Sequence, residues 1–356
     1  MRSCWRPTRT THIFIGCSFG MKRPEAGRGP EGWLEALWYG RSPLAWLLLP
    51  VAGLFRIAVG IRRRAYRAGW LRVHRLPVPV IVVGNITVGG TGKTPVTAWL
   101  VEFCRAAGYR PGVVSRGYGG RPAIKPRLVS PTDKADDVGD EPLLLCRLTG
   151  APVCVHADRV AAGQRLVEAG VNVVIADDGL QHYRLYRDVE IAVLDGQRQL
   201  GNGFMLPAGP LREPAGRLND VDLVLVNAGP AGPGQFVLQS GIGRLRALDG
   251  SATCTLDALR GQRVQAVAGI GNPTRFYAQL AAAGLEVLPV PVPDHGRVDL
   301  ELLRGESKVP IVMTEKDAVK YPPFSGFPVW VAPLEINLPP EVGARVLEHL
   351  SRVKTS

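Results

Sequence analysis

Short runs of aliphatic and β-branched residues alternate with segments of helical periodicity over most of the chain. The clearest strand-like runs are residues 78–83, 171–176, 221–227 and 263–270, with shorter ones near 285–290, 309–313 and 328–332. Continuous apolar runs of this length are typical of strands buried on both faces in a parallel sheet. We expect helices at 95–107, at 272–283 with Asn272 as the N-cap, and at 340–353. The pattern predicts an α/β fold in which helices cover mostly parallel sheets.

A breaker-rich segment divides this pattern into two parts. Residues 229–234 (GPAGPG) contain only glycine, proline and alanine, a composition typical of a linker or hinge. We therefore expect a first α/β domain at 77–228, a second, smaller α/β domain at 229–335 and a closing helical segment at 336–356. Residues 1–40 are an extension whose first twenty residues show no structural pattern, and Met21 is an alternative start.

The segment before the first predicted strand is hydrophobic and then basic. Residues 44–61 would span roughly 27 Å as a helix, near the thickness of a bilayer core, but Pro50 and Arg56 interrupt the run and argue against a span. Arginines interleaved with aromatic and aliphatic residues follow at 62–75, which suits a helix lying in the headgroup layer. We predict a membrane-associated helix within 41–76, attached peripherally or monotopically. A transmembrane anchor and a buried helix with a solvated basic face are the alternatives.

The charge of the chain supports a negatively charged partner. Its 356 residues carry a formal net charge of +12, which suits nucleic acid or an anionic lipid surface. The basic residues are concentrated near the N-terminus without a nucleic-acid-binding motif, so an anionic membrane surface is favoured and nucleic acid is not. The six cysteines show neither CxxC nor metal-ligand spacing, and we interpret them as reduced. No feature points to an obligate protein partner.

A strand–loop–helix segment at 78–107 has the residues of a phosphate-binding loop. The pattern GxxxxGK[ST] is matched at Gly92, Lys93 and Thr94, while Thr87 replaces its first glycine. Glycines let backbone N–H groups turn towards a phosphate. Lys93 then supplies charge to the β- and γ-phosphates of a nucleotide, and the Thr94 hydroxyl ligates Mg²⁺. The predicted nucleotide-binding residues are Thr87, Val88, Gly89, Gly90, Thr91, Gly92, Lys93 and Thr94.

A second strand delivers acidic residues. Residues 171–176 lead directly into Asp177 and Asp178, as a Walker B strand does when it presents a carboxylate to Mg²⁺. Many strands end in aspartate, so the signal is weak alone and gains weight from the phosphate loop upstream. We predict Asp178 as the first Mg²⁺ ligand, with Asp177 as its partner or support.

Several segments, taken together, resemble the tetraacyldisaccharide 4′-kinases, the lipid A 4′-kinase family. In chain order they are VGNITVGGTGKTP (83–95), VVSRGYGG (113–120), VGDEP (138–142), DDGLQH (177–182), LPAGPLREP (206–214), VPDH (292–295) and MTEKDAVK (313–320). The resemblance implies a P-loop NTPase-type α/β/α core, a second α/β/α domain and an active site in the cleft between them. It implies phosphoryl transfer from ATP to the 4′-hydroxyl of an acylated glucosamine disaccharide 1-phosphate, which gives lipid IVA. The expected place of action is the cytoplasmic face of a Gram-negative inner membrane.

The resemblance also implies roles that spacing does not assign. Asp140 matches the general base of the family and His295 the histidine that pairs with it; a sugar hydroxyl needs such a base for its proton. Glu213 is a further candidate Mg²⁺ ligand. Residues expected near the phosphates or the sugar are Ser115, Arg116, Tyr118, Glu141, Arg159, Gln181, His182 and Lys316. Taken without the resemblance, Asp140 is one acid in a charged loop, and Arg159 and His295 would be ordinary surface residues.

Two other functions are compatible with the phosphate loop. One is a P-loop NTPase that hydrolyses nucleotide to drive a protein partner, and the other is a membrane-bound nucleotide-binding scaffold without turnover. A scaffold needs neither a base nor a metal-binding acid, so Asp140 and Asp178 argue against it. Residues 314–317 (TEKD) are similar to a guanine-reading NKxD, but the lysine and aspartate are adjacent, so GTP specificity is not supported.

Overall fold

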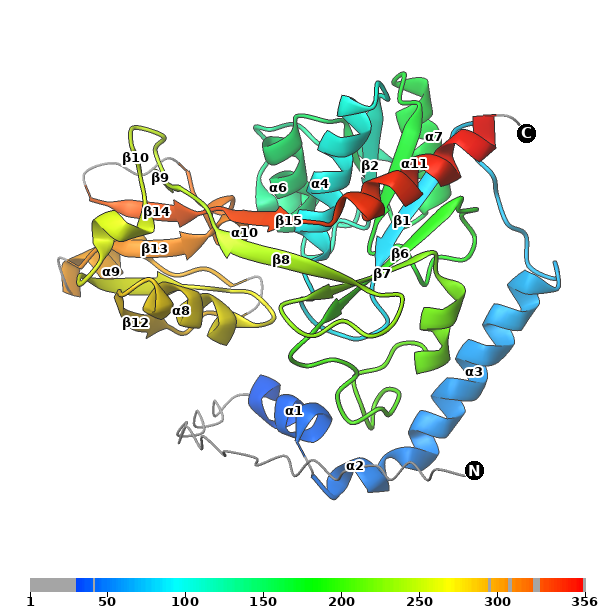
Figure 1. Ribbon diagram of the computed structural model, residues 1–356, viewed down its shortest axis with the longest axis horizontal. Helices are drawn as coiled ribbons and strands as arrows, with labels where there is room; N and C mark the ends of the chain where they lie inside the picture. The colour runs from blue at the N-terminus through cyan, green and yellow to red at the C-terminus, as the bar shows by residue number, and fades with distance from the viewer. Residues whose placement is uncertain (1–29, 41, 294–295, 307–308, 323–326, 355–356) are drawn as a thin grey trace, which may run out of the picture.

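A computed structural model describes residues 30–40, 42–293, 296–306, 309–322 and 327–354 of the chain (Figure 1). The fold is α/β, as the hydrophobic pattern predicts, and contains two sheets. His295 lies outside the described residues.

The first sheet has nine strands, in the order β15-β8-β7-β6-β1-β5-β2-β4-β3. Its central strand, β1 (Val80–Gly84), pairs in parallel with β5 (Val173–Asp177) on one side and β6 (Val189–Asp195) on the other. The remaining strands are β2 (Pro111–Ser115), β3 (Arg127–Leu128), β4 (Val153–Val155), β7 (Leu223–Asn227), β8 (Phe236–Ile242) and β15 (Leu334–Asn337). Because β1 and β5 lie side by side, the phosphate loop and the two aspartates emerge at the same edge of the sheet, where ligands of parallel sheets bind.

Helices cover both faces of this sheet. Side chains from α4 (Lys93–Ala106), α6 (Asp140–Thr149) and α11 (Pro340–Lys354) share one apolar core with one face of the strands. Helix α7 (Arg159–Glu168) packs on the other face, where the inner side of the N-terminal helix α3 (Leu49–Arg67) also contributes. The central strands β1, β2, β5, β6 and β7 are buried because both faces are covered, which explains their continuous apolar sequence.

The second sheet has six strands, in the order β10-β9-β14-β13-β11-β12. Its parallel part comprises β11 (Arg263–Val267), β12 (Glu286–Val290), β13 (Ile311–Thr314) and β14 (Val329–Ala332), and the antiparallel strands are β9 (Leu245–Ala247) and β10 (Thr253–Cys254). The helices of this domain are α8 (Pro273–Ala282), α9 (Leu300–Glu306) and α10 (Glu315–Ala318).

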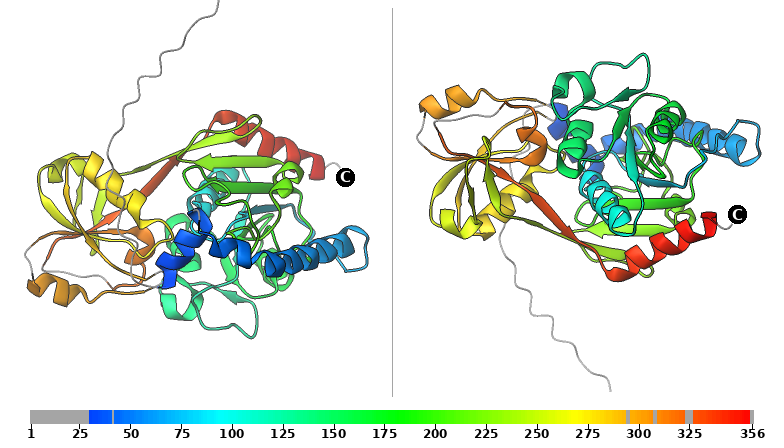
Figure 2. Two further views of the ribbon diagram at one scale, coloured as in Figure 1. Left: turned by 90° about the horizontal axis from the view of Figure 1, so that it is seen from below. Right: turned by 90° about the horizontal axis from the view of Figure 1, so that it is seen from above.

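The chain passes from the first domain to the second after the breaker-rich segment 229–234, not within it. Strand β8 follows residues 229–234 yet pairs in parallel with β7 of the first sheet. Its second half pairs antiparallel with β15, from Leu334↔Ile242 to Asn337↔Gln239. The first domain thus extends past residue 228 to Ile242, and the residues from 334 onward also belong to it. Two paired strands, rather than the expected glycine–proline linker, run between the domains (Figure 2).

Among the residues that the structure describes before β1, three helices are present: α1 (Pro30–Tyr39), α2 (Leu44–Leu47) and α3. Helix α3 lies along the side of the first domain away from the second (Figure 1), where Arg63 and Arg67 both form ion pairs with Asp220. In the described part of the chain, no helix combines the length and apolar character needed to cross a membrane.

Candidate functional site

The phosphate loop occupies the turn from β1 into α4. Gly89 and Gly92 adopt φ values of +112° and +96°, a region that favours glycine. The buried Asn85 holds the loop from inside, because its Nδ2 donates to the Gly89 carbonyl and to the Thr91 hydroxyl, both at 3.3 Å. Thr87 is also buried, so it serves as a wall of the loop. Helix α4 begins at Lys93, two residues earlier than the sequence pattern indicates, which directs its N-terminal N–H groups at the loop.

Asp178 faces the lysine of this loop. The Lys93 Nζ lies 3.6 Å from Asp178 Oδ1, and Arg212 donates to both carboxylate oxygens of Asp178, at 3.2 and 3.0 Å. Burial alone would raise the pKa of Asp178, but the charges of Lys93 and Arg212 outweigh it and lower the pKa to about 2. Asp178 is therefore fully ionised at neutral pH, as a Mg²⁺ ligand must be.

Asp177 has the opposite environment. It is buried beneath the loop, where its Oδ1 accepts a 3.0 Å hydrogen bond from Thr97 Oγ1 of α4. Burial, followed by the charge of Glu141, raises the pKa of Asp177 to about 7. The two neighbouring aspartates thus differ in role: Asp178 carries the exposed charge, and Asp177 anchors α4 to β5.

Asp140 lies at the N-terminus of α6, opposite lysines of the second domain. It is buried, and its Oδ2 lies 4.0 Å from the Nζ atoms of both Lys316 and Lys320. Lys316 also pairs with Glu141 at 3.3 Å, while Lys320 is bound by Asp317 at 2.9 Å. The contact across the two domains brings together three residues predicted separately from the sequence: Asp140, Glu141 and Lys316.

Glu213 is buried, and its partners are Tyr183 and Arg217. Its Oε2 accepts from the Tyr183 hydroxyl at 2.8 Å and lies 3.2 Å from Arg217 Nε. Its other oxygen, Oε1, is buried without a hydrogen-bond partner. Within the residues described, no three His, Cys, Asp or Glu side chains gather as a metal cluster. The ligation of Mg²⁺ by Glu213 therefore stays a prediction.

The remaining predicted residues lie along the edge of the sheet. Ser115 ends β2 and is buried, whereas Arg116 and Tyr118 are exposed in the loop that follows. The Gln181 amide donates to the Asn85 carbonyl at 2.9 Å, which ties the DDGLQH segment to the phosphate loop. Burial and then the charge of Arg159 lower the pKa of His182 to about 4, so this imidazole is neutral at pH 7.

Arg159 is not the helix-surface arginine that an isolated reading of the sequence would give. It is buried at the start of α7, and its Nε has no hydrogen-bond partner. Burial lowers the pKa of Arg159, and the charge of Asp178 opposes that shift. A buried guanidinium with an unsatisfied donor near the acidic end of β5 suits an anionic group of a substrate.

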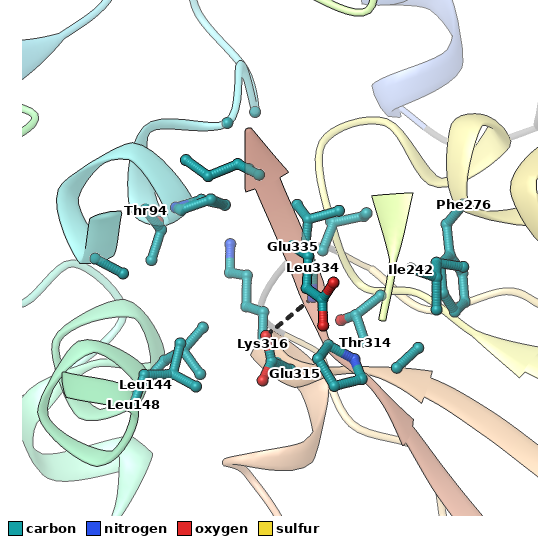
Figure 3. A pocket seen from close by; sticks show the side chains of 18 of the residues that line it. Thr94, Leu144, Leu148, Ile242, Phe276, Thr314, Glu315, Lys316, Leu334 and Glu335 are labelled. Atoms are coloured by element: carbon teal, nitrogen blue, oxygen red, sulfur yellow. Dashed lines mark hydrogen bonds between the residues drawn. The ribbon is translucent and has the colours of Figure 1, made fainter. Parts of the chain in front are cut away.

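A cleft of about 740 Å³ opens beside the phosphate loop, between the two domains. Figure 3 shows its apolar walls, with Leu144 and Leu148 from α6 on one side and Ile242 and Phe276 on the other. Lys316 reaches into the space between them, and the neighbouring Glu315 accepts from the Leu334 backbone N–H at 3.2 Å. The cleft adjoins Gly90 to Thr94, so it has room for a nucleotide whose phosphates lie on the loop.

The sequence of this chain is similar to that of known kinases. The family model described as "Tetraacyldisaccharide-1-P 4'-kinase" matches residues 44–351. The chain belongs to the tetraacyldisaccharide-1-P 4′-kinase family. It is 48% identical over 316 residues to a tetraacyldisaccharide 4′-kinase of Nitrosococcus oceani, covering 88% of this chain and 93% of the relative. A tetraacyldisaccharide 4′-kinase of Aromatoleum aromaticum is 49% identical over 329 residues, covering 89% and 96%.

A solved structure of the family shares the fold. The "apo" form of LpxK from Aquifex aeolicus in complex with ATP superimposes with a TM-score of 0.72 at 27% identity, over 86% of this chain and 99% of that chain. The family resemblance and the kinase activity that the sequence predicts are thereby confirmed, and the switch ATPase and the scaffold lose their support.

Three residues of this 4′-kinase site were not singled out from the sequence. Arg212 lies in the quoted LPAGPLREP segment and Lys320 in MTEKDAVK, but neither was assigned a role. Asn85 lies in the quoted VGNITVGGTGKTP segment, two positions before Thr87, and was not assigned a role either. In each case the contact joins segments far apart in the chain, so only the fold reveals it.

Proposed function

We propose that this member of the tetraacyldisaccharide-1-P 4′-kinase family transfers the γ-phosphate of ATP to the 4′-hydroxyl of tetraacyldisaccharide 1-phosphate, using Lys93 on the phosphate and Asp140 as the base. The arrangement that carries the proposal is the phosphate loop with Lys93 on the wall of the cleft, Asp178 beside Lys93, and Asp140 beside Lys316, which also lines the cleft. Phosphoryl transfer depends mainly on positioning and charge neutralisation, and both kinds of group are present here.

The nucleotide is held by the loop from Thr87 to Thr94. Backbone N–H groups at the start of α4 face the phosphates, and the Lys93 ammonium, which lies between the loop and Asp178, follows the γ-phosphate during transfer. Arg212 stands on the other side of Asp178 and adds a second cation near the transferred group. A guanidinium there stabilises the charge on equatorial phosphate oxygens.

The residues present fit a Mg²⁺ ion. The Thr94 hydroxyl and the ionised Asp178 are oxygen donors of the kind this ion prefers, and the unpartnered Oε1 of Glu213 is a third candidate, with Asp177 in support. When bound, Mg²⁺ neutralises charge on the β- and γ-phosphates. Lys93 and Arg212, which now pair with Asp178, are the groups that would rearrange around such a complex.

Asp140 accepts the proton of the attacking hydroxyl. Its Oδ2 lies 4.0 Å from two ammonium groups of the second domain, which orient the carboxylate. His295 is proposed as its partner on the strength of the family resemblance. Ser115, Arg116, Tyr118, Arg159, Gln181 and His182 lie on the same edge of the sheet, where we propose that they bind the disaccharide and its phosphate.

The face of α3 turned away from the protein suits a lipid surface. Together with Leu47 at the end of α2, its apolar side chains recur at helical spacing and are largely exposed: Leu47 75%, Val51 51%, Leu54 67%, Ile57 59% and Ile61 60%. Arg62, Arg64 and Arg67 follow at the end of the helix. Such a stripe with basic neighbours is typical of a helix lying in an anionic interface. We propose peripheral or monotopic attachment to the cytoplasmic face of the inner membrane.

The decisive experiment follows labelled γ-phosphate from ATP to purified tetraacyldisaccharide 1-phosphate in detergent. Transfer by the wild type that falls at least about 100-fold in Lys93→Ala and in Asp140→Asn, with both variants folded, is the expected result. ATP hydrolysis without transfer to the lipid would overturn the proposal and favour a switch ATPase.

A further inference from the structure

The phosphate loop is held from a second side by Asn227, the last residue of β7. This side chain is buried, and its Nδ2 donates to the Thr91 carbonyl at 3.1 Å. A Cβ atom on Gly92 would lie 2.5 Å from the same Nδ2, so the amide packs directly against the loop. In a trans peptide the C=O and the following N–H point in opposite directions. Holding the Thr91 carbonyl therefore also fixes the direction of the Gly92 N–H.

The other end of this amide is held by residues outside the phosphate loop. Asn227 Oδ1 accepts from Arg275 Nη2 at 2.8 Å and from Ser240 Oγ at 3.1 Å, and Arg275 also donates to Ser240. Arg275 belongs to α8 of the second domain, and Ser240 to β8, which runs between the domains. With its oxygen and its nitrogen both engaged, the amide has one orientation. A single side chain thus joins the loop, the connecting strand and the second domain.

The backbone of the second domain also touches the loop. A Cβ atom on Gly271 would lie 2.5 Å from the Gly90 nitrogen, so two glycine backbones meet here. Arg198 of the first domain holds this approach by donating to the Gly271 carbonyl at 2.7 Å. The sequence predicts Asn272 as the N-cap of α8, and Asn272 does stand at that position, but its side chain makes no capping hydrogen bond. It donates instead to Asp195 at 3.3 Å. The start of α8 is therefore fixed against the loop, which gives Arg275 a defined position.

We propose that Asn227 is a positioning residue of the phosphate loop and that Arg275 couples ATP binding to the placement of the second domain. If the second domain withdraws, Asn227 Oδ1 loses its charged donor and keeps only the Ser240 hydroxyl, so the amide is held less firmly against Thr91. The loop then binds ATP less well, and by reciprocity ATP favours the arrangement in which Arg275 is engaged. This inference depends on nucleotide binding at the loop and not on the identity of the lipid acceptor.

A double-mutant cycle tests the coupling. The variants are Asn227→Ala, Arg275→Met and the two combined, and the measurements are calorimetric binding of ATP and the KM values for ATP and for the acceptor. Each single change is expected to raise the Kd and KM for ATP about tenfold, because it removes a buried or charge-assisted hydrogen bond. The combined variant should lose little more than either alone, whereas independent effects would multiply to about 100-fold. The KM for the acceptor should change less than about twofold, which a general structural defect would not spare.

Two further variants keep the test decisive. Arg260→Met makes the same change at an exposed arginine of the second domain and should leave ATP binding unchanged. Asn227→Asp retains an oxygen acceptor for Arg275, so it keeps the contact with the second domain, but it removes the donor to Thr91 and should still weaken ATP binding. Effects that multiply in the cycle, or full ATP affinity in Asn227→Asp or Arg275→Met, would overturn the proposal.

Discussion

Arg212 clamps Asp178 with two hydrogen bonds, Nη1 to Oδ2 at 3.2 Å and Nη2 to Oδ1 at 3.0 Å. The same guanidinium donates to the side chain of Asn85 beneath the phosphate loop. Asp178 itself has a backbone φ of +49°, an uncommon conformation for a residue with a side chain. The clamp therefore holds the carboxylate and the loop in one arrangement.

Removing this clamp should impair transfer more than nucleotide binding. Arg212→Met is expected to lower kcat for phosphate transfer about 100-fold, because the variant loses a cation next to the transferred group. Arg212→Lys keeps the charge but not the two-pronged geometry, and we expect it to recover only part of the rate. Arg263→Met, at an exposed ion pair of the second domain, is the matched control. A kcat for Arg212→Met within threefold of wild type would contradict this role.

The neutral imidazole of His182 makes stability depend on pH. Its folded-state pKa of about 4 lies below the ordinary value of 6.5, so the unfolded chain binds more protons between these values. Stability is then lost as the pH falls from 7 towards 4. Between pH 7 and pH 5 the wild type should lose stability to this protonation, whereas His182→Gln should not. We therefore expect the loss in unfolding free energy to be smaller in His182→Gln by roughly 1 kcal/mol, a value already reduced for the partial exposure of His182. Urea denaturation at both pH values measures it, and His349→Gln serves as a substitution of the same type elsewhere. Equal losses in wild type and His182→Gln would refute the assignment.

The exposed stripe of α3 should mediate binding to vesicles. Leu54→Glu places a charge on the stripe without disturbing a packed side chain, since Leu54 is 67% exposed. Sedimentation with vesicles that contain anionic lipid should recover at least about fivefold less Leu54→Glu than wild type. Leu302→Glu, at a leucine of α9 that is 62% exposed, should sediment as the wild type does. Unchanged binding of Leu54→Glu would exclude this face as the lipid contact.

The buried cation beside Asp140 should matter for stability. The side chain of Lys320 is 3% exposed and pairs with Asp317, which is 1% exposed. Lys320→Met would leave the buried Asp317 carboxylate without its ion-pair partner, so we expect a loss of about 3 kcal/mol in the free energy of unfolding. Combining it with Asp317→Asn removes the unpaired charge and should recover part of that loss. Denaturant titration of the three variants decides the matter, and a Lys320→Met variant as stable as wild type would show that the pair is dispensable.

The local parts of the site follow from the sequence, and the non-local ones do not. The phosphate loop, Lys93, Asp177 and Asp178 are recognisable because a strand, a turn and a helix follow one another within a few residues. Arg212 reaches Asp178 from 34 positions away, and Arg275 reaches Asn227 from 48. No periodicity encodes such contacts. Asp140 entered the prediction only through the family, because an acid in a charged loop has no local signature.

The domain boundary shows the same limit. Residues 229–234 have the composition of a hinge, and the pattern alone places the division there. Strand β8 is instead bound to β7 before it and to β15, which lies almost a hundred residues further along the chain. Its alternating burial reflects a ribbon covered on one side only, and the partner that makes it a ribbon is invisible in the local sequence.

Helix α11 has a consequence for the order of events during synthesis. Val342, Val346 and Leu350 are completely buried in the core of the first domain, together with Val189, Ile191 and Leu223. A ribosome makes these last residues only after it has made the whole second domain, since chains grow from the N-terminus. One face of the sheet in the nucleotide-binding domain therefore stays partly uncovered until the second domain has been synthesised. The newly synthesised kinase cannot complete its ATP-binding half until the second domain has been made.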